Sequence, residues 1–207
     1  MQHTWLCVLV LVTACSTTVR SSGSTNPATP DPRAELAAKR AVLLDRLHDY
    51  WTAGELPVDE LGQPASVFRD QAGHECPMAR MITLSGHGDL VAAVVQKNNR
   101  LKLADVHEGP LLDWMLASGL TRDEIVMVQG ALDIDYGTFQ LELPPGSPMM
   151  IAVARGEVKN RIRTAEALLR KQTKRSLKVA AAALPAGPRV PSKGPVIPKA
   201  LEVAAQN

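Results

Sequence analysis

Four residues that lie close together in the sequence have side chains able to take part in catalysis: Asp70, His74, Glu75 and Cys76. A histidine beside a cysteine can remove the thiol proton, and Pro77 predicts that Cys76 stands at a helix N-terminus, where the pKa of a thiol is lowered. Asp70 and Glu75 act in the opposite direction, because nearby negative charge raises that pKa. No recognisable nucleophile motif surrounds Cys76. A buried structural thiol is therefore the favoured interpretation, and a thiol-dependent hydrolase using Cys76 and His74 is the alternative.

The same segment also has metal-ligand chemistry. Asp70, His74 and Cys76 could form part of a tetrahedral zinc shell if the fold brought His87 or His107 close to them. Their spacing matches no established zinc pattern, because the order His, Glu, Cys, Pro is not the HisGluXXHis arrangement of zinc enzymes. We therefore predict no metal and no cofactor, and keep the metal-dependent hydrolase as part of the alternative.

A second acidic segment, around Asp133 and Asp135, has a weak similarity to a calcium loop. Gly137 occupies a position where another oxygen ligand is needed, and Pro144 replaces the closing glutamate. A turn between short strands is the favoured interpretation of this segment.

The N-terminus has the pattern of an export signal. Residues 5–12 are an unbroken apolar run, which suits a signal peptide and is far shorter than the roughly 20 residues that a membrane-spanning helix needs. No lysine or arginine precedes the run, which departs from the usual basic start. Val12, Thr13, Ala14 and Cys15 resemble the lipobox of bacterial lipoprotein precursors.

The lipobox resemblance implies where the protein is located and how it is held there. It implies that residues 1–14 are removed, that the Cys15 sulfur carries a diacylglycerol, and that the new amine is acylated. Two or three acyl chains hold a protein stably on a membrane. Residues 16–30 are rich in Ser, Thr, Gly and Pro and predict a flexible tether. Ser16, which is not aspartate, favours the outer membrane under the sorting rule of that family.

Composition predicts one helical domain. The chain has 207 residues and only 3% aromatic residues, which favours a core of Leu, Val, Ile, Met and Ala in helices over a β-sandwich. Once Cys7 and Cys15 are accounted for, Cys76 is the single thiol of the mature chain, so no internal disulfide forms. Residues 155–178 hold nine Lys or Arg against Glu157 and Glu166, whereas the preceding part is acidic.

The spacing of apolar residues predicts the elements that position these side chains. A helix is expected over 32–53, a second from Pro77, a third capped by Asp89, and a fourth from Pro110 to Gly119. Thr121 and Glu124 form a capping box that begins the next helix. Residues 132–143 fit either a short hairpin or an extended strand, and a basic helix over about 156–180 is expected to pack on its own domain, with lipid binding as the alternative.

The tight corner between the fourth and fifth helices superficially resembles a DNA-binding helix-turn-helix. Its second helix presents Asp123 and Glu124 with Arg122, whereas contacts to phosphates and bases require cations and amides. Export also argues against this function, so no nucleic-acid partner is predicted.

Residues 67–129 resemble a family of uncharacterised exported bacterial domains that share a PheXAspXXGlyXXCys block. The matching residues are Phe68, Asp70, Gly73, Cys76, Ser85, Gly86, Asn98, Asn99, Trp114, Ser118, Gly119, Leu120 and Thr121. Pro77 departs from the small or apolar residue expected after the cysteine. The resemblance implies an architecture and no activity.

Together these patterns predict a mostly α-helical, single-domain bundle with a minor extended element. Its parts are a signal peptide (1–14), a tether (15–30), a helical domain (31–180) and a disordered Pro-rich tail (181–207). The predicted function is that of a lipid-anchored envelope protein with a non-catalytic interaction or structural role. Its predicted partners are the membrane, through Cys15, and another envelope protein.

Overall fold

The computed structural model describes residues 31–138 and 143–184. The expected signal peptide, lipidation site, tether and nearly all of the Pro-rich tail lie outside these residues. The described part is mostly helical, as predicted. Its α-helices are α1 (Pro32–Ala53), α2 (Pro77–Leu84), α3 (Gly88–Asn98), α4 (Gly109–Ala117), α5 (Arg122–Gly130), α6 (Pro148–Lys171) and α7 (Thr173–Ala183), with short 3-10 helices at Leu103–Asp105 and Tyr136–Thr138.

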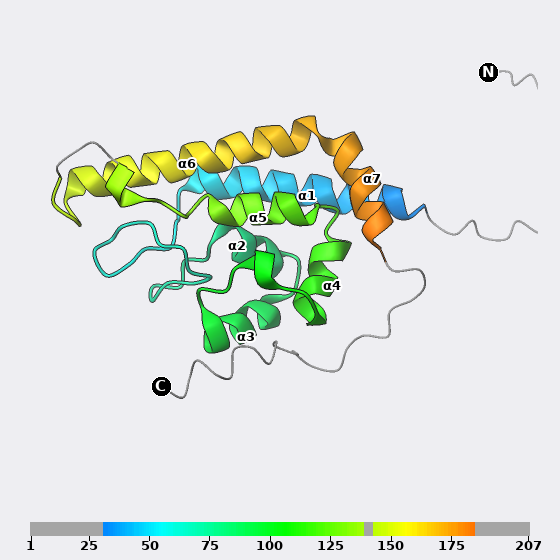
Figure 1. The fold of residues 1–207 in the computed structure, drawn as a ribbon, viewed down its shortest axis with the longest axis horizontal. Coiled ribbons are helices and arrows are strands. Elements are labelled where there is room, and N and C mark those ends of the chain that lie inside the picture. The colour runs from blue at the N-terminus through cyan, green and yellow to red at the C-terminus, as the bar shows by residue number, and fades with distance from the viewer. Residues whose placement is uncertain (1–30, 139–142, 185–207) are drawn as a thin grey trace, which may run out of the picture.

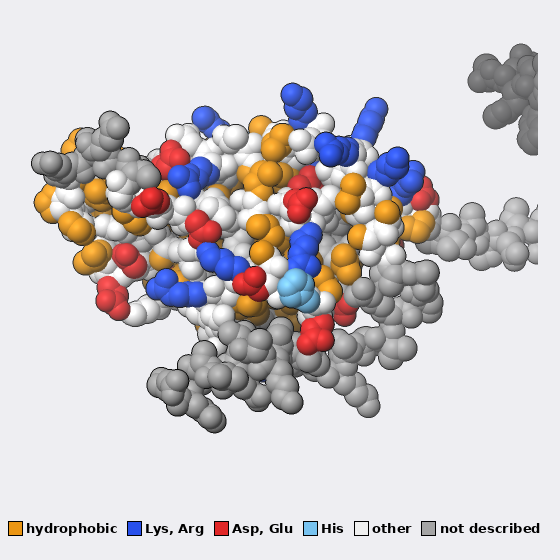
Figure 2. All heavy atoms as spheres, viewed as in Figure 1, with side chains coloured by type: hydrophobic (Ala, Val, Ile, Leu, Met, Phe, Trp, Pro, Cys, Tyr) orange, Lys and Arg blue, Asp and Glu red, His pale blue; other side chains and the backbone are white. Residues whose placement is uncertain are grey.

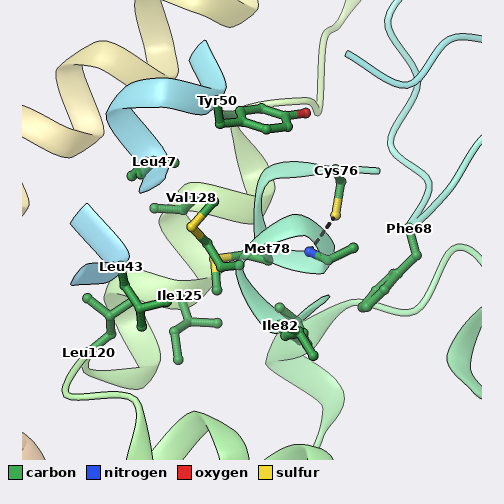
Figure 3. Packing of buried hydrophobic residues seen from close by; sticks show 14 of the residues in the cluster. Leu43, Leu47, Tyr50, Phe68, Cys76, Met78, Ile82, Leu120, Ile125 and Val128 are labelled. Carbon is green, nitrogen blue, oxygen red and sulfur yellow. Dashed lines mark hydrogen bonds between the residues drawn. The ribbon is translucent and has the colours of Figure 1, made fainter. Parts of the chain in front are cut away.

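The longest helices, α1 and α6, run side by side, and α7 turns back across the first half of α1 (Figure 1). Helices α2 and α5 pack below this pair, and α3 and α4 complete the far side (Figure 1). Leu43 of α1, Met78 and Ile82 of α2, and Ile125 and Val128 of α5 converge in one buried core (Figure 3). All the described α-helices except α7 contribute to this single cluster of buried apolar side chains.

Helix α1 begins and ends where the sequence predicts. The Asp31 carboxylate accepts a hydrogen bond from the Arg33 amide at 3.0 Å, and Pro32 fills the first helical position. Gly54 has φ of 72° and donates its N–H to the Tyr50 carbonyl, which ends the helix. Local cap signals therefore determine both ends.

Three local expectations need correction. Asp89 lies in the first turn of α3 and not at its N-cap, which is His87. The predicted basic helix consists of α6 and α7, separated at Gln172, and α6 begins at Pro148 because the Ser147 hydroxyl accepts from the Met150 amide at 3.3 Å. Of the segment 132–143, residues 139–142 lie outside the described residues, and Tyr136–Thr138 form a 3-10 helix. Extended pairing in the described ranges is limited to the bridges Val58–Pro64 and Arg69–Glu75.

Among the helices of residues 31–138 and 143–184, none combines the length and the apolar character that crossing a membrane requires.

Candidate functional site

The Cys76 side chain is a helix cap. It is 2% exposed, and its sulfur accepts a hydrogen bond from the Ala79 amide at 3.3 Å (Figure 3). Burial raises the pKa of the Cys76 thiol to about 12, and this effect outweighs the hydrogen bonds that lower it. The thiol is therefore protonated at neutral pH and shielded from substrates. The burial of Cys76 expected from the sequence is confirmed.

His74 is oriented by Asp70 and not by Cys76. Its ring Nδ1 lies 2.9 Å from Asp70 Oδ2, and its backbone N–H donates to Asp70 Oδ1 at 2.8 Å. The Val58 amide donates to the same carboxylate at 3.1 Å. Burial raises the pKa of Asp70, but the hydrogen bonds from His74 and Val58 outweigh it and hold that pKa below its ordinary value. Asp70 therefore orders two loop segments.

Glu75 connects the same loop to α2. Its Oε1 accepts from the Arg69 guanidinium at 2.6 Å and from the Thr83 hydroxyl at 2.9 Å, and its Oε2 faces Arg80 at 4.0 Å. Its backbone carbonyl accepts from the buried Tyr50 hydroxyl of α1 at 2.9 Å. The Glu75 side chain therefore joins the loop to α2, and its backbone carbonyl joins the loop to α1.

The metal hypotheses find no geometric support. Within the described ranges, no three His, Cys, Asp or Glu side chains are arranged to hold a metal ion, so the set of Asp70, His74 and Cys76 is not completed by His87 or His107. Asp133, from the calcium-like segment, instead forms an ion pair with Lys102 at 2.5 Å. The turn that follows is a 3-10 helix, and no strand flanks it in the described residues.

A second buried polar centre was not identified from the sequence. Arg40 of α1 is 1% exposed and forms two hydrogen bonds of 2.7 Å to the Glu124 carboxylate of α5. It also donates to the Leu169 carbonyl of α6 at 2.6 Å and to the Gly119 carbonyl at 3.2 Å. The Ser176 hydroxyl of α7 completes the centre, donating to Glu124 at 2.6 Å.

Electrostatics favours the ionised form of this centre. Burial raises the pKa of Glu124, but the bonds from Arg40, Ser176 and the Thr121 amide outweigh it, so the pKa lies below the ordinary glutamate value. The sequence did contain a signal that Arg40 is buried. Arg40 lies four residues after Leu36 and three before Leu43, on the apolar face of α1. The Arg40–Glu124 centre connects four helices, and its three side chains are buried.

An open groove lies between α1, α3 and α4, and it was also not predicted. Its volume is about 1030 Å³. Leu43, Leu90, Trp114 and Ala117 contribute apolar surface to it, and Val42, which is 47% exposed, stands on the α1 side. The charged side chains of the groove are separated by sign. Lys39 and Arg46 lie on the α1 wall, and Asp89 and Asp113 lie on the opposite wall.

Comparison with known proteins finds no counterpart. No family model matches the chain, and neither the curated proteins nor the solved structures include a significant match.

Proposed function

We propose that this chain is a lipid-anchored bacterial envelope protein whose helical domain is a non-catalytic interaction module. The anchor is Cys15, exposed after removal of residues 1–14, and Ser16 favours the outer membrane. The proposed interaction role is supported by a contrast between the residues suited to catalysis and the groove. The side chains suited to catalysis, Cys76 foremost, are buried or hydrogen-bonded within the domain, whereas the apolar groove between α1, α3 and α4 is open at the surface.

The occupant that best fits the groove is an amphipathic helix of another envelope protein. The groove follows α1 from Ala38 to Arg46, which corresponds to about 12 Å of helix. An apolar helix face suits the floor formed with Trp114, as in other helix-in-groove complexes. Because the two walls of the groove carry opposite charges, we expect the partner helix to place acidic side chains near Lys39 and basic side chains near Asp89. The charge pattern therefore also sets the direction in which the partner helix binds.

The anchor is tested by lipid labelling. The parent chain is expected to incorporate labelled palmitate and to sediment with membranes, and Cys15→Ser is expected to abolish both. The variant Cys7→Ser is the matched control, because it changes a thiol within the predicted signal and should leave labelling intact. Undiminished labelling and sedimentation of Cys15→Ser would overturn the proposed anchor.

The groove is tested by photo-crosslinking in intact cells from position 42, with position 127 as the control. Val42 lies on the groove, and Met127 is a comparably exposed apolar residue of α5 outside it. A discrete adduct with an envelope protein is expected from position 42 and not from position 127.

Charge reversal makes the groove test specific. Asp89→Lys changes one wall of the groove, whereas Asp123→Lys makes the same change in the first turn of α5, away from it. The adduct from position 42 should fall several-fold with Asp89→Lys and persist with Asp123→Lys, because a like charge at a rim suppresses binding. Equal effects of the two variants, or equal adducts from both positions, would contradict the proposal.

A further inference from the structure

Helices α6 and α7 have one apolar face and one cationic face. The buried side includes Val158, Ile162, Ala165 and Leu169 of α6 and Ala180 of α7, so packing of the basic segment on its own domain is confirmed. The other side is exposed to solvent. Six of the exposed cations of the two helices are here called the basic ridge: Arg155, Arg163, Lys171, Lys174, Arg175 and Lys178.

The basic ridge is not neutralised by the domain. The nearby acidic side chains bind other groups: Glu157 pairs with Arg161 at 2.8 Å, and Asp45 pairs with Arg170 at 2.9 Å. Glu166 points inward, accepting from the Trp51 indole at 2.6 Å and from Arg170 at 2.7 Å. In the part of the chain that the structure describes, no acidic group lies within ion-pair distance of a ridge cation.

The cations of the ridge belong to one side of the molecule. Lys and Arg side chains gather along the side formed by α6 and α7, where few acidic groups separate them (Figure 2). Residues 155–178 extend over about 36 Å at the rise of an α-helix, less the shortening at the bend. Such an edge is suited to an extended anionic surface, because its cations are spread along two helices.

The chain enters the domain at this same edge. Helix α1 begins at Pro32, and its first half contacts α7 (Figure 1). Residues 16–30 span at most about 50 Å when fully extended. A membrane-held Cys15 therefore keeps the ridge near the bilayer surface at high effective concentration.

We propose that the basic ridge binds the anionic phospholipid headgroups of the membrane that carries the anchor. The orientation at the membrane depends on the proposed anchor, whereas the affinity of the ridge for anionic lipid does not. Nucleic acid is a poorer fit, because neither α6 nor α7 contains an aromatic residue on which a base could stack. When the basic ridge faces the membrane, the groove between α1, α3 and α4 stays open to a partner protein.

The test uses the full chain with Cys15→Ser, so that no acyl chain contributes to binding. Co-sedimentation is measured with vesicles of phosphatidylcholine alone and with vesicles that also contain phosphatidylglycerol. Binding is expected only with phosphatidylglycerol and should weaken at high salt, because ions screen exposed charges. Lys174→Gln with Lys178→Gln should weaken it about thirtyfold, at about 1 kcal/mol for each cation near an anionic surface.

The matched control is Lys97→Gln with Arg100→Gln, which removes the same charge from exposed side chains at the end of α3. This control should bind phosphatidylglycerol vesicles as the parent does. Equal weakening by both double variants, no preference for phosphatidylglycerol, or ridge-dependent binding of an RNA homopolymer without vesicle binding would overturn the proposal. Because the protein in this test carries no lipid, its failure leaves the palmitate result at Cys15 unaffected, and the reverse also holds.

Discussion

Two regions of this domain contain polar side chains that are withdrawn from water, and they differ in how they are assembled. Residues 70–76 are neighbours in sequence, and their side chains satisfy backbone amides and each other within one loop and helix start. The Arg40–Glu124 centre joins residues from α1, α5, α6 and α7 that are far apart in the chain. The region with the more catalytic residue types thus stabilises one loop and its neighbours, whereas a pair that attracts no attention in the sequence connects four helices.

The largest effect is expected from Arg40→Met. It should lower the free energy of unfolding by about 3–5 kcal/mol, because it removes the guanidinium that pairs with the buried Glu124 carboxylate and donates to the Leu169 carbonyl. Lys39→Met is the neighbouring control and should cost at most about 1 kcal/mol, since the Lys39–Glu35 pair is exposed. Denaturant unfolding measures both. Similar losses for the two variants would mean that the Arg40–Glu124 centre does not organise the bundle.

A slightly smaller loss of folding stability is expected from Gly119→Ala, because Gly119 lies beside the Arg40–Glu124 centre. Gly119 has φ of 80°, and a Cβ there would lie 2.2 Å from the Leu36 carbonyl oxygen. Strain and overlap together should cost about 3 kcal/mol. Gly86→Ala is the control, because Gly86 has a similar φ of 87° with no atom within 4 Å of the added Cβ, and it should cost about 1 kcal/mol. Thermal or denaturant unfolding would contradict this account if both glycines tolerated alanine equally.

The smallest effect is expected in residues 70–76. At neutral pH, Asp70→Asn should cost about 1–2 kcal/mol, because the carboxylate accepts from the Val58 and His74 amides and contacts the His74 ring. The pKa of Asp70 is lowered by folding, so its contribution is complete above the ordinary value of 3.8 and is lost as pH falls through the lower folded pKa.

The difference between the Asp70→Asn variant and the parent should therefore shrink as the solution is acidified below the ordinary aspartate pKa. The free energy of unfolding is measured from neutral to strongly acidic pH for the parent and the variant. Asp105→Asn changes an exposed aspartate and is the control, whose free energy of unfolding should match that of the parent at each pH. A difference that grew on acidification would contradict the sign assigned to Asp70.

Signals within a few residues of each other predicted much of the fold. Asp31, Pro32 and Gly54 set the ends of α1, and the capping box of Thr121 and Glu124 begins α5 as expected. These predictions succeeded because a cap is satisfied by the backbone amides next to it. The break at Gln172 and the 3-10 helix at Tyr136–Thr138 were missed, because no glycine, proline or capping box at Gln172 and no helical apolar period at Tyr136–Thr138 indicates them.

The functional surfaces were less predictable than the helices. Burial of Cys76 was predicted because no nucleophile motif surrounds it, but the orientation of His74 toward Asp70 required the loop geometry. The pairing of Arg40 with Glu124 and the groove between α1, α3 and α4 depend on contacts between distant segments. The cationic face of α6 and α7 was visible in the sequence, but its freedom from acidic neighbours was not.

The reactivity of Cys76 tests most directly whether residues 70–76 maintain structure and do not catalyse. In a full chain with Cys7→Ser and Cys15→Ser, Cys76 is the remaining thiol. We predict that a thiol reagent leaves the folded protein unlabelled at neutral pH and that labelling appears with denaturant along the unfolding transition. Rapid labelling of one equivalent in the fully folded protein would contradict this account and restore the thiol nucleophile.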